Sequence, residues 1–124
     1  MKLFIYIVYF FLSWFAPSPE ITDEVVAAVK QGKPSEIVKY FEEKVSIKVI
    51  EQEDVLSKPQ AEALLKFFFE KHPVKAFNSV YVSTINSNSQ YITGNLETSS
   101  GKFRVSILIK RNLVSQFRIE TDND

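Results

Sequence analysis

The side chains that could carry acid–base or metal chemistry are few in this sequence of 124 residues. There is one histidine, His72, and no cysteine. Thiolate metal sites and thiol nucleophiles are therefore excluded, and a zinc site or a serine–histidine triad would need unusual partners. His72 stands beside Pro73 at the predicted end of a helix, where a histidine is typical of a C-terminal cap that favours the helix dipole. A general base is the alternative role for His72.

The carboxylates form no convincing site either. Glu51, Glu53 and Asp54 are close together in "EQEDV", but the stretch lacks the glycine and the spacing of a calcium loop. A site like that of ketosteroid isomerase would need a buried carboxylate opposite a tyrosine such as Tyr40. The nearby acids fall at positions that the pattern predicts to be exposed: Glu42, Glu43, Glu62 and Glu70. We therefore expect no catalytic residue, no metal and no cofactor.

Composition narrows the class of protein further. The 15 basic and 15 acidic side chains balance, which argues against nucleic acid as a partner because phosphate binding needs a basic surplus. Hydrophobic residues make up 45% of the chain, enough for a real core, and the length suits one domain.

The N-terminal stretch "MKLFIYIVYFFLSWFAPSPE" predicts export. Lys2 precedes an apolar run that is short for a transmembrane helix and fits a secretory signal. The prolines at positions 17 and 19 disfavour cleavage, so an uncleaved membrane anchor is the alternative. We expect residues 1–18 to be this signal or anchor, residues 19–121 to form one domain, and residues 122–124 to be a frayed tail. Contact with a membrane is expected only through an uncleaved N-terminal segment.

The elements that must position any site begin with two short helices. "ITDEVVAAVKQGKP" predicts a helix capped by Thr22 and ended by Gly32. "PSEIVKYFEEKV" predicts a second helix, capped by Ser35. The alternation in "VSIKVIEQEDVLS" then predicts a strand.

A third helix is predicted over "SKPQAEALLKFFFEKHP", where Ser57 and Gln60 form a capping box. Phe67, Phe68 and Phe69 point in three directions about 100° apart, so the helix is apolar around more than half its circumference and other elements must surround it. In one interpretation these rings fill the core. In the other, a ligand pocket for an apolar small molecule is lined by Tyr40, Phe41, Phe67 and Phe69.

Four extended segments follow, over 75–86, 89–99, 102–111 and 113–122, with Asn, Ser and Gly in the turns. They predict an antiparallel meander and an α+β fold. The apolar face would carry Val80, Val82, Ile92, Leu96, Phe103, Val105, Ile107, Ile109, Phe117 and Ile119. Tyrosine and arginine on the other face would suit a homodimer interface, with residues Tyr81, Tyr91, Arg104 and Arg118. An ordinary solvated face with cross-strand pairs is the alternative.

This order of elements resembles the nuclear transport factor two-like fold, a cone in which a bent sheet wraps around helices. Three stretches, "SKPQAEALLKFFFEKHP", "YITGNLETSSGKFRVSILIK" and "FRIE", resemble the domain of unknown function 4783, a family of small exported proteins of Gram-negative bacteria. The resemblance implies the fold and a periplasmic or cell-envelope location. It implies no activity.

We therefore expect an exported, non-catalytic domain that binds either an apolar small molecule in the cone or a protein partner on the outer sheet face. The alternative is a small enzyme similar to the isomerases and dehydratases of the broader fold, with an acid/base group in the cone cavity.

Overall fold

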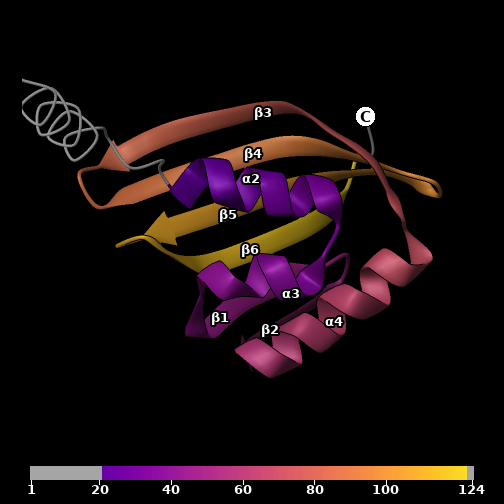
Figure 1. The fold of residues 1–124 in the computed structure, drawn as a ribbon, viewed down its shortest axis with the longest axis horizontal. Coiled ribbons are helices and arrows are strands. Elements are labelled where there is room, and N and C mark those ends of the chain that lie inside the picture. Colours follow the sequence, from indigo (N-terminus) through magenta and orange to yellow (C-terminus); the bar gives the residue numbers. More distant parts are fainter. Residues whose placement is uncertain (1–20, 123–124) are drawn as a thin grey trace, which may run out of the picture.

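The structure, a computed structural model, describes residues 21–122. The predicted signal or anchor over residues 1–18 and most of the predicted tail lie outside the described residues. The described part is an α+β domain in which helices cover one face of a six-stranded sheet (Figure 1).

Three α-helices, one short 3-10 helix and six strands make up the described residues. In chain order they are α2 (Ile21–Gln31), α3 (Pro34–Ile37), η1 (Val38–Tyr40), β1 (Phe41–Val49), β2 (Gln52–Ser57), α4 (Lys58–Lys71), β3 (Val74–Asn86), β4 (Ser89–Thr98), β5 (Gly101–Lys110) and β6 (Leu113–Thr121).

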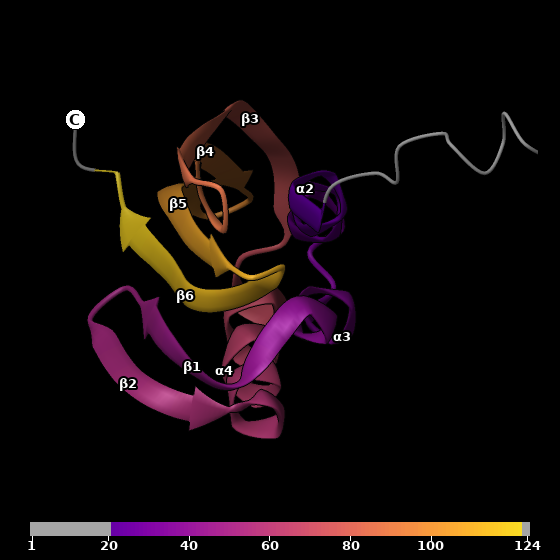
Figure 2. The same ribbon diagram turned by 90° about the vertical axis from the view of Figure 1, so that its left-hand side faces the viewer.

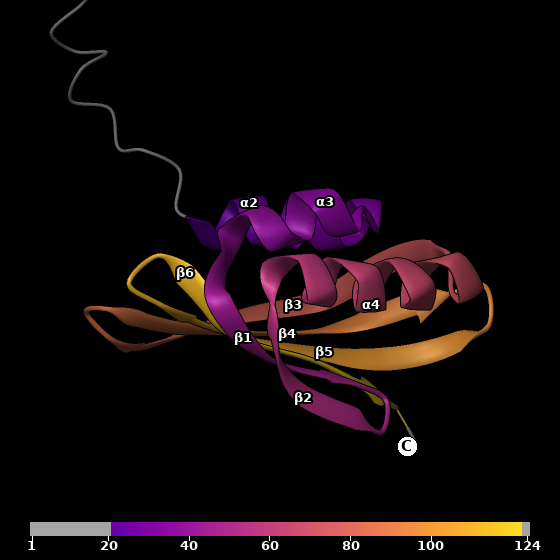
Figure 3. The same ribbon diagram turned by 90° about the horizontal axis from the view of Figure 1, so that it is seen from below.

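The sheet has the strand order β2-β1-β6-β5-β4-β3. The predicted meander over the last four strands is confirmed, with antiparallel pairing throughout. β1 joins it by pairing in parallel with β6, the last of the described strands, and Ile47 lies opposite Phe117. Figures 2 and 3 show the sheet bending, with α2, α3 and α4 on its concave side.

The helix from Ile21 ends as predicted. Gly32 has φ 63°, and its N–H lies 3.1 Å from the carbonyl oxygen of Ala28 and 3.0 Å from that of Val29. This left-handed residue closes the helix at low cost because glycine has no Cβ. Thr22, expected to cap the helix, instead lies within it and is buried.

The prediction of a second helix over "PSEIVKYFEEKV" is wrong in the second half of that stretch. Only Pro34–Ile37 is α-helical, and β1 begins at Phe41. The expected cap is also wrong, because the N-cap position is held by Lys33 without a side-chain hydrogen bond and Ser35 lies inside the helix. Pro34 explains the start, since its fixed φ suits the first helical position and favours an extended residue before it. Strand pairing, of Phe41 with β6 and of Lys44 and Val45 with β2, outweighs the helix propensity of "FEEKV".

The predicted strand over residues 45–57 is a hairpin of two strands, β1 and β2. The chain reverses at Ile50, which has φ 61°. A β-branched residue in this left-handed region is strained. The Ile50 N–H donates a hydrogen bond of 2.7 Å to the Ile119 carbonyl, which ties the turn to β6.

The capping box of α4 is confirmed. The Ser57 hydroxyl accepts from the Gln60 N–H at 3.4 Å, and the Gln60 side-chain oxygen accepts from the Ser57 N–H at 3.1 Å. These two bonds satisfy donors that the first turn of a helix leaves free.

The concave face of the sheet and the buried faces of the helices form one apolar core. The predicted alternation of the sheet holds from Ile92 to Ile119, whose inward positions are buried. Val82 is the exception, because β3 is an edge strand with an irregular register and the Val82 side chain is 43% exposed. Gly94 leaves space on the buried face of the sheet, and the ring of Phe77 fills that space. A Cβ added to Gly94 would lie only 2.5 Å from Phe77 Cε1.

Candidate functional site

The centre of the cone is filled by side chains. The largest fully buried side chains include Phe41, Phe117, Ile37 and Leu65, drawn from helices and strands alike. The buried polar side chains of the described residues carry no titratable group: Thr22, Ser89, Thr98 and Ser106. Among the described residues, pockets open beside α4, at the β3–β4 and β5–β6 turns, and between α2 and α3.

The four predicted pocket residues lie in three different places. Phe41 is fully buried and Phe69 is 7% exposed, so both belong to the core. Phe67 is 58% exposed and lines a pocket beside α4. Tyr40 lines a separate pocket between α2 and α3.

An apolar pocket of about 220 Å³ lies between the second half of α4 and the β1–β2 turn. Its apolar lining comes from Val49, Ile50, Leu64, Phe67 and Phe68, and its polar lining from Gln52, Lys71 and His72. We call this the α4 pocket. Apolar walls with a few polar groups at the rim are typical of small-ligand sites.

Lys71 lies over the exposed ring of Phe67, with its Nζ 4.2 Å from the ring centroid. This cation–π contact contributes about 0.5–1 kcal/mol at an exposed site. The rim of the α4 pocket therefore combines an aromatic surface with a positive charge.

His72 is held firmly at the other side of the same rim. Its ring stacks on Phe68, with centroids 4.6 Å apart, and meets Phe103 edge-on at 5.0 Å. Its Nδ1 lies 2.5 Å from Ser100 Oγ, and the Ser100 hydroxyl donates to the Lys71 carbonyl at 3.1 Å. Because the single hydroxyl proton goes to Lys71, Nδ1 must be the donor toward Ser100, which leaves Nε2 as the free acceptor of the neutral ring.

Burial, and then the charge of Lys71, lower the pKa of His72 below its ordinary value. His72 does occupy the C-cap position of α4, as predicted. Its lowered pKa means that the ring favours the neutral form, so it is poorly suited to act as a cation at the helix dipole.

The alternative of a small enzyme needs a carboxylate beside Tyr40. The carboxylate that Tyr40 contacts is that of Glu24, which lies at the surface. Burial, and then the charge and hydrogen bond of Glu24, raise the pKa of Tyr40. Glu24 is exposed on α2, and the pocket of about 190 Å³ that the two residues share is also lined by Glu36. The buried carboxylate that a ketosteroid-isomerase-like site needs is not among the described residues near Tyr40.

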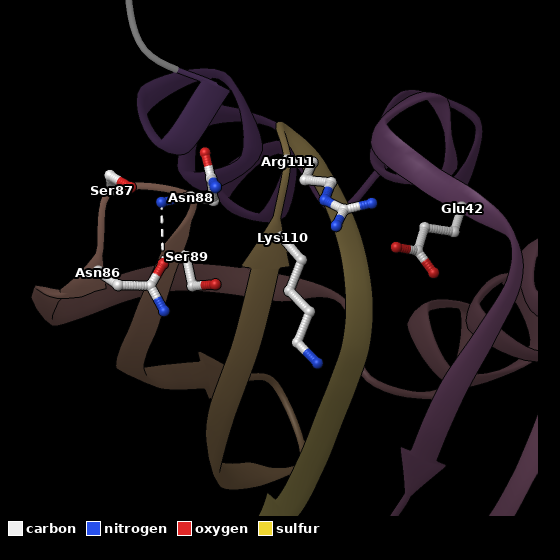
Figure 4. A pocket seen from close by; sticks show the side chains of 7 residues that line it. All are labelled: Glu42, Asn86, Ser87, Asn88, Ser89, Lys110 and Arg111. Carbon is white, nitrogen blue, oxygen red and sulfur yellow. Dashed lines mark hydrogen bonds between the residues drawn. The ribbon is translucent and has the colours of Figure 1, made fainter.

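A polar pocket of about 390 Å³ lies at the opposite end of β1 from the α4 pocket. Three segments line it: the start of β1, the β3–β4 turn and the β5–β6 turn. The lining residues are Glu42, Asn86, Ser87, Asn88, Ser89, Lys110 and Arg111 (Figure 4). We call this the turn pocket.

The residues predicted for an interface face are not equivalent. Tyr81 is 68% exposed on β3, and Arg104 is exposed on β5. Arg118 on β6 is occupied by two carboxylates: its guanidinium lies 3.2 Å from Glu53 of β2, on the far side of β1, and 3.5 Å from Glu120 of its own strand. Only the contact with Glu53 runs between strands, and both carboxylates engage Arg118 within the sheet face. Tyr91, opposite Leu108 on β5, is half-buried.

The sequence signalled parts of these sites. The turns that build the turn pocket, between the segments 75–86 and 89–99 and between 102–111 and 113–122, were predicted, but their meeting with Glu42 depends on the parallel β1–β6 pairing. Within residues 21–122, no group of three or more His, Asp or Glu side chains is placed to hold a metal ion. Among the described helices none has the length and apolar character needed to cross a bilayer.

Comparison with known proteins identifies the family. A family model described as Domain of unknown function (DUF4783) matches residues 22–121. A DUF4783 family protein from Bacteroides ovatus is 32% identical, with a TM-score of 0.74 over 82% of this chain and 94% of that chain. One from Bacteroides uniformis is 29% identical, with a TM-score of 0.76 over 82% of this chain and 97% of that chain.

A more distant structure agrees in fold alone. A domain of unknown function with a cystatin-like fold, from Nostoc punctiforme, is 13% identical, with a TM-score of 0.61 over 84% of this chain and 74% of that chain. A search of curated proteins finds no match to the chain. The resemblance drawn from the sequence motifs is therefore confirmed: the chain belongs to the DUF4783 family and has a cystatin-like, nuclear transport factor two-like fold.

Proposed function

We propose that this protein is an exported, non-catalytic binding domain, and that its α4 pocket takes a small apolar molecule with an acidic group. The observation that carries the proposal is Phe67, a large aromatic side chain left 58% exposed at the rim of an apolar pocket. Its neighbours Phe68 and Phe69 are buried, so the exposure of Phe67 is specific to its position on α4.

The chemistry of the rim favours an acidic ligand. Lys71 lies beside Phe67, and His72 offers Nε2 from a ring that is fixed by stacking and by Ser100. A carboxylate at the rim would pair with Lys71 and would favour the protonated, donating form of His72. The rest of the ligand would lie on Leu64 and Phe68.

The shape of the pocket adds a second support. Its wall at the β1–β2 turn is formed by Ile50, which is held in a left-handed conformation that a β-branched residue adopts only under constraint. Strained residues cluster at binding sites, where surrounding structure holds them in place. The volume, about 220 Å³, suits a ligand smaller than a typical drug molecule.

The experiment is an NMR titration of the purified protein with phenylacetate and with 2-phenylethanol, which share the ring and differ in charge. We expect both to shift the backbone amide signals of Ile50 and Phe67, and phenylacetate to bind more tightly. Lys71→Gln should remove the preference for the acid. Phenylacetate should bind more tightly below the pKa of His72 than above it.

Phe67→Ala tests the pocket itself and should weaken both probes without unfolding the protein. Lys66→Ala is the matched control, because Lys66 is exposed on α4 and does not line the pocket. The proposal fails if neither probe shifts these signals at millimolar concentration, or if Lys66→Ala weakens binding as much as Phe67→Ala.

A further inference from the structure

We infer that the turn pocket is a second binding site, separate from the α4 pocket, for a small zwitterion of the amino-acid type. Such a ligand carries a carboxylate and an ammonium group a few bonds apart. The inference rests on the charges that face this pocket and on how rigidly their backbones are placed.

Two cations and one carboxylate border the pocket. Figure 4 shows the guanidinium of Arg111 and the carboxylate of Glu42 pointing toward each other across it, while the side chain of Lys110, the last residue of β5, runs along the strand away from Arg111. In the described part of the chain, neither Lys110 nor Arg111 forms an ion pair with an acidic side chain. Arg111 and Glu42 therefore face the pocket without an ion pair between them, and Lys110 borders it from the end of β5.

The walls that carry these charges are tied together by backbone contacts. Arg111 and Asn112 have φ values of 53° and 65°, so the β5–β6 turn consists of two left-handed residues, typical of a tight hairpin. The Arg111 N–H donates to the Asn88 carbonyl at 2.8 Å, which joins this turn to the β3–β4 turn. Within that second turn, the Asn88 N–H donates to Asn86 Oδ1 at 2.8 Å.

Glu42 reaches the pocket from a different part of the fold. It lies near the start of β1, where Phe41 is opposite Val114 of β6. Since Glu42 stands on β1 and Arg111 in the β5–β6 turn, and both line the pocket, a ligand between them can contact both at once. A fixed arrangement of this kind lowers the ordering cost of binding.

The polar lining suits a zwitterion better than a simple anion. Lys110 and Arg111 would hold a carboxylate, while the hydroxyl and amide groups of Ser89 and Asn88 add hydrogen bonds. Glu42 would repel a bare anion but would pair with an ammonium group. The volume of about 390 Å³ falls within the range of small-molecule sites and has room for a free amino acid or a dipeptide.

The test uses three dipeptide probes: alanyl-alanine, its N-acetyl derivative and its C-terminal amide. The N-acetyl derivative lacks the ammonium group, and the amide lacks the carboxylate. Titrations are followed through the backbone amide signals of Asn88 and Arg111. We expect alanyl-alanine to bind most tightly, because each derivative leaves one pocket charge unpaired. Removing one charge-assisted hydrogen bond should weaken binding about tenfold.

Substitutions then assign the charges. Lys110→Gln and Arg111→Asn should each weaken alanyl-alanine about tenfold; asparagine is chosen because it tolerates the left-handed conformation of the turn. Glu42→Gln should weaken alanyl-alanine while leaving the N-acetyl derivative unchanged or tighter. Glu43→Gln is the matched control, since Glu43 is the exposed neighbour of Glu42 and does not line the pocket.

Three results would overturn the inference. The first is no shift at these signals with alanyl-alanine. The second is equal binding of the N-acetyl derivative, which would indicate a simple anion site. The third is an equal effect of Glu42→Gln and Glu43→Gln, which would mean that only the overall charge matters.

Discussion

The three consecutive phenylalanines of α4 provide a test in which one substitution, Phe→Ala, is made in three different environments. Phe68 is 3% exposed and Phe69 is 7% exposed, whereas Phe67 is 58% exposed. The phenylalanines share one helix and are adjacent in sequence. Differences in stability among the three variants should therefore come from burial and packing.

Phe68→Ala should lower the free energy of unfolding by about 3–5 kcal/mol, the usual cost of removing a buried aromatic ring. The Phe68 ring makes edge-on contacts with Phe69 at 5.2 Å and with Phe103 at 5.1 Å, and it stacks on His72. Removing it leaves a cavity and frees the rings that it orients. Phe69→Ala should be similarly severe.

Phe67→Ala should change stability by less than about 1 kcal/mol, because two small effects oppose each other. The variant loses the cation–π contact with Lys71, worth about 0.5–1 kcal/mol at an exposed site. It gains helix propensity, since alanine is the better helix former by roughly 0.5 kcal/mol.

The assay is urea unfolding followed by far-ultraviolet circular dichroism, with the slope and midpoint fitted for each variant. Unchanged slopes with separated midpoints would show that the native state alone is affected. If Phe67→Ala unfolds at the same urea concentration as Phe68→Ala, the orientation of α4 given above is wrong, and so is the α4 pocket.

Three further predictions concern the sheet, pH and export. Gly94→Ala should destabilise the protein by about 1–3 kcal/mol through its clash with Phe77, and the double variant with Phe77→Leu should recover part of the loss in urea unfolding. Because the pKa of His72 is lowered on folding, protonation favours the unfolded chain. The free energy of unfolding should therefore be highest at pH values above 6.5, the ordinary pKa of histidine, and should decrease as the pH is lowered from there. In His72→Gln, the urea midpoint should depend less on pH over this range. Cell fractionation should recover the protein outside the cytoplasm, whereas soluble full-length cytoplasmic protein would contradict export.

Much of the fold could be predicted because local pattern and tertiary contacts agree in most elements. Alternation from Ile92 to Ile119 matches the buried face, and the Ser57–Gln60 capping box marks the start of α4. The prediction failed at "FEEKV", where good helix formers are drawn into β1 by the pairing of Phe41 with β6 and of Lys44 and Val45 with β2. Such long-range pairing leaves no local signal.

The candidate sites were less predictable than the fold. Phe67 was predicted to line a pocket, but the sequence could not separate it from Phe69, since the two differ only in which neighbours approach α4. The turn at Ile50 was missed because a β-branched residue with positive φ runs against turn preferences. The turn pocket was missed because its walls come from distant segments.

The parallel pairing of β1 with β6 also determines when this protein can finish folding. Lys48 and Glu120, joined by an ion pair of 3.1 Å across these strands, are 72 residues apart in the chain. Until the last strand arrives, the β1–β2 hairpin has no place in the sheet, and the inward residues of β1 have no β6 neighbour. Contacts this distant slow folding, and the sheet stays incomplete until β6 has been synthesised. If the chain is exported as proposed, a domain that folds only after β6 is made would still be unfolded when the export machinery engages it.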